Sequence, residues 1–209
     1  MRTSIALFFV LAGCSEASVD AVVVDAGART GTDVVTAADT GSPADAGSPA
    51  DTGAAATGLV FNEIRATGSE FVEVFNAGSL AVDLSNVQMT DTESDGGGPH
   101  LSAAIHFPAG TSVAPGQYLV VVSGVADAGA GLQHACLDGG VATCFEAGWS
   151  ISASRGETVY LLSPTGAVAA SEMYPASAAS SGQSWGRLPN GTGAFAVNRP
   201  TPGAANLAP

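Results

Sequence analysis

The chain of 209 residues contains no lysine, and its six arginines face nineteen acidic residues, which gives a formal net charge of −13. A chain this acidic repels phosphate backbones, so the composition argues against a nucleic-acid partner. Aromatic residues make up only 6%. No apolar run approaches the roughly 20 residues that a transmembrane helix needs, so an ordinary membrane span is not expected. Glycine, in contrast, is abundant.

Residues 1–13 have the layout of an export signal. Arg2 supplies the positive start, the apolar run IALFFVLA follows, and Ala12 and Gly13 are the small residues of a cleavage site. Together with Cys14 they complete the tetrapeptide LAGC, which resembles the lipobox of bacterial lipoproteins. The resemblance implies cleavage before Cys14, thioether lipidation of its sulfur and acylation, as by palmitate, of the new amino terminus. The alternative is an ordinary signal peptide with a chance cysteine.

Lipidation would make the membrane a partner of the chain. A single fatty chain binds membranes only weakly, at about 0.8 kcal/mol per buried CH₂, whereas two or three chains on one cysteine give a lasting anchor. Ser15 follows the cysteine. By the sorting rule of lipoproteins in double-membraned bacteria, a residue other than aspartate here suggests the outer membrane.

Cys14 begins a segment, 14–58, that is expected to be a disordered linker. It consists mainly of Ala, Asp, Gly, Thr, Ser, Pro and Val, repeats the pentapeptide GSPAD, and has no aromatic residue. Its seven acids and one arginine give a net charge of −6. Such a composition buries too little apolar area to offset the entropy of ordering. As a flexible coil it would reach roughly 35 Å, which suits a spacer between a membrane and a domain.

From Leu59 onward the sequence predicts an all-β domain. LVFNEI and EFVEVFN alternate with period two, as half-buried strands do, and VQMT, AAIHF, YLVVVS, TVYLLS and VAASEMY follow. Turn-forming stretches such as SDGGGP, SPTG and LPNG separate them. About eight short strands over this length are typical of a β-sandwich or barrel.

These strands resemble a lamin tail domain, whose fold is an immunoglobulin-like β-sandwich. The resemblance would cover residues 59–206 and leave a short tail, 207–209. The residues that carry it are NEI at 62–64, FVEVFNAG at 71–78, VDLSNVQMTD at 82–91, FPAGTSVAPGQYLVV at 107–121, GQSWGRLPNGTGAF at 182–195 and RPTPGAAN at 199–206. Residues 124–148 depart from the pattern and are expected to be an inserted loop.

Cys136 and Cys144 remain once Cys14 carries lipid. In an exported chain they are expected to form a disulfide, since the intervening LDGGVAT contains a tight-turn signal. The alternative is a metal site that uses His134 with both thiolates, although a fourth ligand is not evident.

Acids at alternate positions suggest a calcium loop in DTESDG. Asp91, Glu93 and Asp95 precede Gly96, and calcium loops use this spacing because a tight turn converges alternate oxygens on the ion. An EF-hand would place Glu at position 12 of the loop, where Ser102 stands. The alternative is a solvated acidic hairpin loop. No other cofactor is expected.

Two further acids, Glu63 and Glu73, lie on strands that are expected to be neighbours. A carboxylate pair can hydrolyse glycosides when its members stand about 5–10 Å apart. The alternative is that each acid is solvated or pairs with Arg65 or Arg187. The histidines show no recognisable nucleophile partner in the sequence. We therefore expect no enzyme.

The sequence thus predicts a lipid-anchored protein of the bacterial cell envelope that displays a β-sandwich as a non-catalytic binding or structural module. Its protein or glycan partner is not identifiable from the sequence, because sandwiches host unrelated functions. Two alternatives remain: an accessory domain of an extracellular hydrolase or nuclease system, and a calcium-dependent adhesion module.

Overall fold

A computed structural model describes residues 58–126, 128 and 143–209 of the chain. The predictions for the signal peptide, the lipidated Cys14 and the linker lie outside these residues. So do Cys136 and His134. Within the described part of the chain, no helix has the length and apolarity that crossing a membrane would require.

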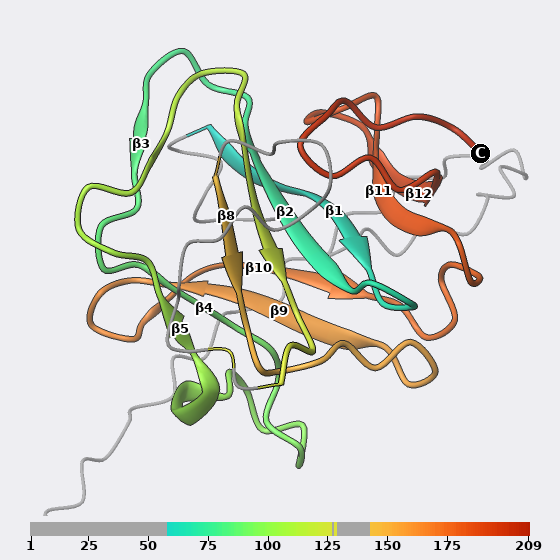
Figure 1. The fold of residues 1–209 in the computed structure, drawn as a ribbon, viewed down its shortest axis with the longest axis horizontal. Helices are drawn as coiled ribbons and strands as arrows, with labels where there is room; N and C mark the ends of the chain where they lie inside the picture. Colours follow the sequence, from blue (N-terminus) through green and yellow to red (C-terminus); the bar gives the residue numbers. More distant parts are fainter. Residues whose placement is uncertain (1–57, 127, 129–142) are drawn as a thin grey trace, which may run out of the picture. The chain divides into compact units, whose positions relative to one another are not determined.

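The described residues form twelve strands and one short 3₁₀ turn, η2 (Figure 1). The first seven strands are β1 Leu59–Arg65, β2 Phe71–Asn76, β3 Val82–Asp83, β4 Gln88–Thr90, β5 Ile105–His106, β6 Ser112–Val113 and β7 Tyr118–Val122, with η2 (Leu101–Ala103) before β5. The last five are β8 Cys144–Glu146, β9 Glu157–Leu162, β10 Val168–Tyr174, β11 Ser184–Leu188 and β12 Ala194–Asn198. The all-β prediction is confirmed, and three of the additional strands, β3, β6 and β8, contain only two or three residues.

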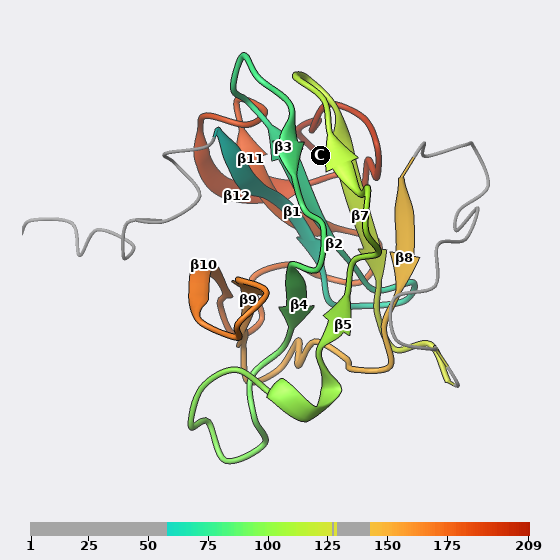
Figure 2. The same ribbon diagram turned by 90° about the vertical axis from the view of Figure 1, so that its left-hand side faces the viewer.

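The strands form two main sheets that pack over one core (Figures 1 and 2). The larger sheet has the order β12-β11-β1-β2-β7-β8 and the smaller one β10-β9-β4-β5, while β3 and β6 form a separate ribbon. All named pairs are antiparallel except β7–β8, which is parallel. The chain is thus an immunoglobulin-like β-sandwich, as expected.

Alternate side chains of both sheets build the core. Val72, Val74, Leu119 and Val121 come from the larger sheet, and Val159 from the smaller one, and all are fully buried. This period-two alternation is the reason that the strands can be recognised in the sequence.

A β-bulge in β1 interrupts the alternation of inward- and outward-facing side chains just before Glu63. The register between β1 and β2 shifts between Phe61 and Glu63, so that Asn62 is the extra residue. Phe61 and Ile64 therefore both enter the core. Simple alternation places Glu63 on the same face as Phe61, but the bulge turns Glu63 to the outer face of the sheet, where Glu73 also lies.

Candidate functional site

The two acids of the larger sheet, Glu63 and Glu73, are directly opposite each other and fully buried. Solvation of the two acids, one alternative that the sequence left open, is therefore wrong, and among the described residues no arginine lies within ion-pair distance of either carboxylate. Arg187 instead contacts Glu172 at 3.3 Å. Within the described residues Arg65 makes no ion pair with Glu63.

The chain's C-terminal segment, residues 199–207, covers both carboxylates and supplies hydrogen bonds to them. The backbone N–H of Thr201 donates to both oxygens of Glu63 at 3.2 Å, and its hydroxyl donates to Oε2 at 3.2 Å. The N–H of Gly203 donates to Oε2 of Glu73 at 2.6 Å, while Nδ2 of Asn62 donates to Oε1 at 2.7 Å. Every carboxylate oxygen therefore has a partner from the protein itself.

Further amides fix the C-terminal segment to the sheet. Nδ2 of Asn206 donates to the carbonyls of Asn62 at 2.9 Å and Arg187 at 3.1 Å. The N–H of Asn206 donates to Oδ1 of Asn190 at 3.0 Å. Buried polar groups that are satisfied in this way stabilise one arrangement of the chain.

Burial is the main influence on both acids. It raises the pKa of Glu63, against the hydrogen bonds from Ser184 and Thr201, and raises the pKa of Glu73 to about 8, where the nearby Glu63 charge adds to the rise. A catalytic pair must reach its substrate, whereas neither of these side chains reaches solvent. The pair is therefore structural and has no access to a glycoside.

A further sequence motif, which was not recognised from the sequence, contributes a residue to the surroundings of these two acids. Residues 182–186 read GQSWG, which fits the G-x-S-x-G motif of hydrolase nucleophiles. Ser184, however, begins strand β11, is fully buried, and donates its hydroxyl hydrogen bond to Glu63. No histidine contacts it among the described residues. The motif requires an exposed serine on a strand-to-helix turn beside a histidine, so the match carries no catalytic meaning.

A groove lies at one end of the smaller sheet, between the β4–η2 loop and the segment that leads into β9. It consists of two cavities of about 400 Å³ and 410 Å³. The residues that line both are Thr92, Ser94, Ser152, Arg155 and Glu157. Glu93, Asp95 and Met173 line the first cavity only, and Asp91 and His100 the second only. We refer to this site as the acidic groove.

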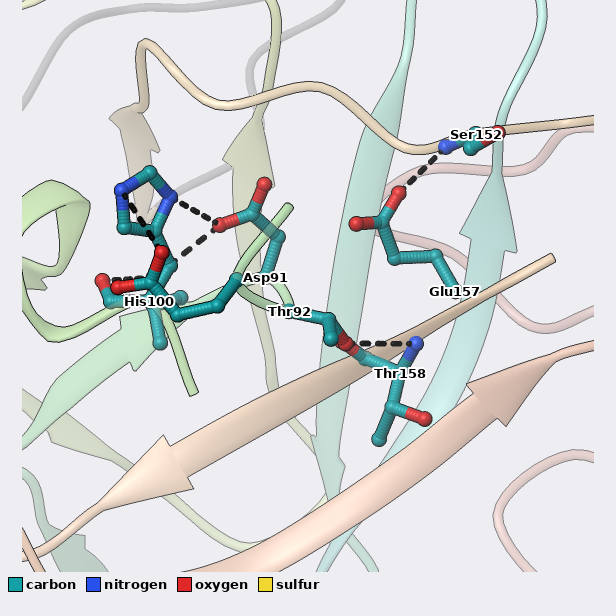
Figure 3. Close-up of polar contacts among 8 residues, drawn as sticks. Asp91, Thr92, His100, Ser152, Glu157 and Thr158 are labelled. Carbon is teal, nitrogen blue, oxygen red and sulfur yellow. Dashed lines mark hydrogen bonds and ion pairs between the residues drawn. The ribbon is translucent and has the colours of Figure 1, made fainter. Parts of the chain in front are cut away.

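One wall of the acidic groove carries a histidine between two acids. Nδ1 of His100 lies 3.4 Å from Oδ1 of Asp91 (Figure 3). Its Nε2 lies 3.8 Å from Oε2 of Glu93. Asp91 is only 7% exposed. Burial raises the pKa of Asp91, as does the charge of Glu157, while His100 acts in the opposite direction. This wall therefore places two carboxylates beside a single imidazole.

Hydrogen bonds between side chains and backbone groups hold the opposite wall in place. The N–H of Ser152 donates to Oε2 of Glu157 at 2.6 Å, and the other oxygen of Glu157 points toward Asp91 (Figure 3). The hydroxyl of Thr92 donates to the carbonyl of Thr158 at 2.9 Å, which ties the loop to β9. Both walls are therefore fixed to the smaller sheet.

The predicted calcium loop forms part of this groove but does not gather its acids. Asp91 turns toward His100, and Oδ1 of Asp95 accepts the N–H of Gly97 at 2.8 Å. In the part of the chain that the structure describes, no three His, Cys, Asp or Glu side chains come together as a metal site. The calcium interpretation of Asp91, Glu93 and Asp95 is thus not supported, because alternate acids converge only when the loop curls around the ion and this hairpin does not.

Sequence reasoning did not identify Ser152, Arg155 or Glu157 as site residues. They follow a segment without a motif, and only the fold brings them opposite the 91–100 loop. No local signal in the sequence could have found them.

Of the predicted disulfide, the structure describes one half. Cys144 begins β8, is fully buried, and lies opposite Val120 of β7. Its predicted partner, Cys136, lies outside the described residues, as does His134 of the alternative metal site. The bridge remains a prediction.

Comparison with known protein families identifies one family. No curated protein matches the chain. The family model described as Lamin Tail Domain matches residues 52–176, which is more than half of the chain. The match ends before β11, β12 and the C-terminal segment, so the expected resemblance of residues 182–206 is not part of it. On this match, and on the sandwich that the strands form, the chain belongs to the lamin tail domain family.

Proposed function

We propose that this protein is a bacterial lipoprotein that displays its lamin tail domain as a non-catalytic binding module in the cell envelope. The observation that carries the proposal is the order of three features in the sequence: LAGC at 11–14, an acidic segment without aromatics up to residue 58, and the β-sandwich from Leu59. A lipid on Cys14 would fix the chain to a membrane, and the segment would hold the domain away from it.

The absence of catalysis is supported by the buried acids. Glu63 and Glu73 have the spacing of a strand pair, but protein donors occupy all of their oxygens and the C-terminal segment covers them. His100 faces Asp91 and Glu93, and no serine or cysteine of the described residues forms a hydrogen bond with its ring. A nucleophile mechanism needs such a contact, at about 2.6–3.2 Å.

The outer membrane is the proposed location, since Ser15 rather than aspartate follows the lipidated cysteine. The negative charge of residues 15–58 also disfavours contact with anionic lipid. The domain would therefore stand free in the envelope, where a binding site at one end of the sandwich is accessible.

The test is metabolic labelling of the full chain in a double-membraned bacterial host. Wild-type protein should incorporate an alkyne-tagged palmitate, require detergent for extraction and fractionate with the outer membrane. Cys14→Ala should lose the label and remain unprocessed or leave the membrane. Cys136→Ala removes a different cysteine and should keep the label, which makes it the matched control.

The proposal fails if Cys14→Ala still carries palmitate, or if wild-type protein is mature in size yet soluble without detergent. Recovery of the labelled protein from the inner membrane would correct the location alone.

A further inference from the structure

We propose that the free edge of strand β12 pairs with the same strand of a second copy of this chain, so that two larger sheets join into one continuous sheet. Three observations support this pairing: the unprotected edge of β12, the self-complementary order of its side chains, and the distribution of charge along the chain. The pairing rests on the proposed function in one respect, because a lipid anchor would bring copies together on one membrane.

Strand β12 is the long sheet edge that the fold leaves unprotected. The two main sheets end at β12, β8, β10 and β5, and Figure 2 shows β12 and β10 on the same side of the sandwich. Short strands, bulges and charges keep sheet edges from pairing with other strands. β5 and β8 have only two and three residues, while β10 has a register shift between Val168 and Ala170 and contains Glu172. β12 uses none of these protections.

The five residues of β12, AFAVN, contain neither a charge nor a proline. They pair with β11 in continuous register from Ala194 to Asn198. Within the described part of the chain, no strand lies on the other side of β12. Its outer backbone groups can therefore form a ladder with another strand.

Apolar side chains next to this edge are only partly buried. Phe195 and Val197 of β12 lie opposite Arg187 and Trp185 of β11. The rings of Trp185 and Phe195 stack with their centres 6.3 Å apart, and both pack against the core. Phe195, Val197 and Trp185 nevertheless retain some exposure. A strand added at the edge of β12 would cover these side chains from the open side.

The side chains of β12 are self-complementary in an antiparallel pair that is centred on Ala196. Two-fold symmetry places Ala196 opposite its own copy, and Phe195 of each chain opposite Val197 of the other. Phe195 and Val197 share one face of the strand, so both contacts are pairs of an aromatic and a β-branched residue, which stabilise sheets. All five residues are then paired. Any other antiparallel register leaves at least one residue of each strand unpaired.

The distribution of charge favours this end of the chain for contact between copies. The whole chain carries a net charge of −13, so its copies repel each other. No acid follows Glu172, however, and the last 37 residues contain two arginines, Arg187 and Arg199. The symmetric register would separate Arg199 from its copy by about 20 Å, which exceeds the Debye length at physiological salt. A second copy therefore meets less repulsion at β12 than at the acidic groove.

The size of the contact connects it to the membrane anchor. Five paired residues on each side form a small interface, so copies that are free in solution should associate weakly. A lipid on Cys14 would confine the copies to one surface and raise their effective concentration. The proposed anchor thereby increases the population of the β12 dimer.

Disulfide cross-linking of the full chain tests the register, both in membranes of the expressing cells and in concentrated purified protein. In Ala196→Cys the symmetry axis brings the two Cα atoms to about 4.5–5.5 Å, a separation that a disulfide can bridge. Ala194→Cys is the matched control, because about 13 Å would separate Ala194 from its copy. After mild oxidation, non-reducing electrophoresis should show a dimer of Ala196→Cys and none of Ala194→Cys.

A charge on the symmetry axis tests the pairing without a cross-link. Ala196→Lys would place two ammonium groups directly opposite each other, which destabilises a strand pair. Sedimentation of the full chain in mild detergent should show a dimer dissociation constant that is raised at least about tenfold. Ala169→Lys adds the same charge at an exposed position of β10 and should change the constant less than about twofold. Melting curves establish that each variant is folded.

The edge pairing is refuted if Ala196→Cys does not cross-link more than Ala194→Cys, or if folded Ala196→Lys associates like wild type. Palmitate labelling is measured separately. Protein that lacks palmitate but cross-links through Ala196→Cys when concentrated contradicts the anchor alone. Labelled protein that stays monomeric contradicts the edge pairing alone.

Discussion

Glu63 and Glu73 are cross-strand neighbours in the β1–β2 ladder, and neither side chain reaches solvent. Two adjacent carboxylates without surrounding water repel each other when both are charged, so one of them retains its proton well above the usual pH. The two carboxyl groups accept hydrogen bonds from Thr201 and Gly203 of the C-terminal segment. The retained proton therefore affects how this segment is held on the sheet.

The first prediction concerns pH. Folded Glu73 holds its proton to about pH 8, whereas the unfolded chain releases it near 4.5. Between these values the folded state binds more protons, so the free energy of unfolding should fall as pH rises, by up to about 1.4 kcal/mol per pH unit for one group. Burial shifts Glu63 and Asp91 in the same direction. Urea unfolding between pH 5 and pH 8 measures the slope.

Glu73→Gln should flatten this slope, because glutamine stays neutral throughout. Asp83→Asn serves as the control, since Asp83 is exposed and its pKa is lowered by its hydrogen bonds to Ser85. An equal slope in wild type and Glu73→Gln would show that Glu73 is not the group that titrates.

The second prediction concerns a glycine beneath the C-terminal segment. A Cβ on Gly186 would clash with Nδ2 of Asn198, and it would lie 2.8 Å from both Nδ2 of Asn206 and the carbonyl oxygen of Asn62. These neighbours are buried, so an added methyl group would find no free space. Gly186→Ala should therefore destabilise the domain by roughly 2–3 kcal/mol, a decrease in Tm of several degrees.

The matched control for that glycine is Gly148→Ala. The nearest atom to its added Cβ would be the carbonyl oxygen of Val125 at 3.9 Å, an ordinary contact. Calorimetry should find the control within about 0.5 kcal/mol of wild type. Equal melting of both variants would contradict the close packing around Gly186.

The third prediction is the Cys136–Cys144 bridge. Cys144 is fully buried, and closing the short loop would add about 2.5 kcal/mol on the loop-entropy model. Peptide mapping without reductant, on protein purified from the envelope, should recover the two cysteine peptides linked. The same linkage should persist in Cys14→Ala, because Cys14 is expected to carry lipid rather than to pair. Alkylation of both thiols before any reduction would refute the bridge.

The fourth prediction is that calcium has no specific effect on stability. The acids at 91, 93 and 95 do not converge, and Asp95 already accepts the N–H of Gly97. At about 10 mM calcium, even a site with a Kd near 10⁻³ M would stabilise the domain by about 1.4 kcal/mol. We expect the melting temperature in EDTA and in calcium to agree in both wild type and Asp95→Asn. An increase in wild type that Asp95→Asn abolishes would restore the calcium loop.

The strands were predictable because their causes are local. VAASEMY coincides with β10, and the alternation in EFVEVFN gives the Val72 and Val74 core positions of β2. The burial of Glu73 was not predictable in this way. An acid between two apolar residues has the pattern of a solvent-facing position, and only the C-terminal segment, 130 residues away in sequence at Gly203, covers it.

The acidic groove was not predictable from the sequence for the same reason, because residues distant along the chain form it. DTESDG is visible as an acidic turn, but Glu157 reaches it only because β4 and β9 pair in the smaller sheet. Propensity and periodicity describe neighbours along the chain, whereas pairing across many residues depends on the packing of the whole sandwich. The direction in which His100 turns, toward Asp91 and Glu93, likewise follows from side-chain packing that no sequence pattern encodes.

The position of β1 between β2 and β11 has a consequence for the timing of folding. A chain that is threaded through a membrane with its amino terminus first delivers β1 early, but β11, β12 and the C-terminal segment arrive last. The larger sheet cannot be completed, nor its two acids enclosed, before the end of the chain has passed. For the exported chain that we propose, the larger sheet would therefore be completed only after translocation, and the polypeptide would stay extended while it passes a narrow export channel.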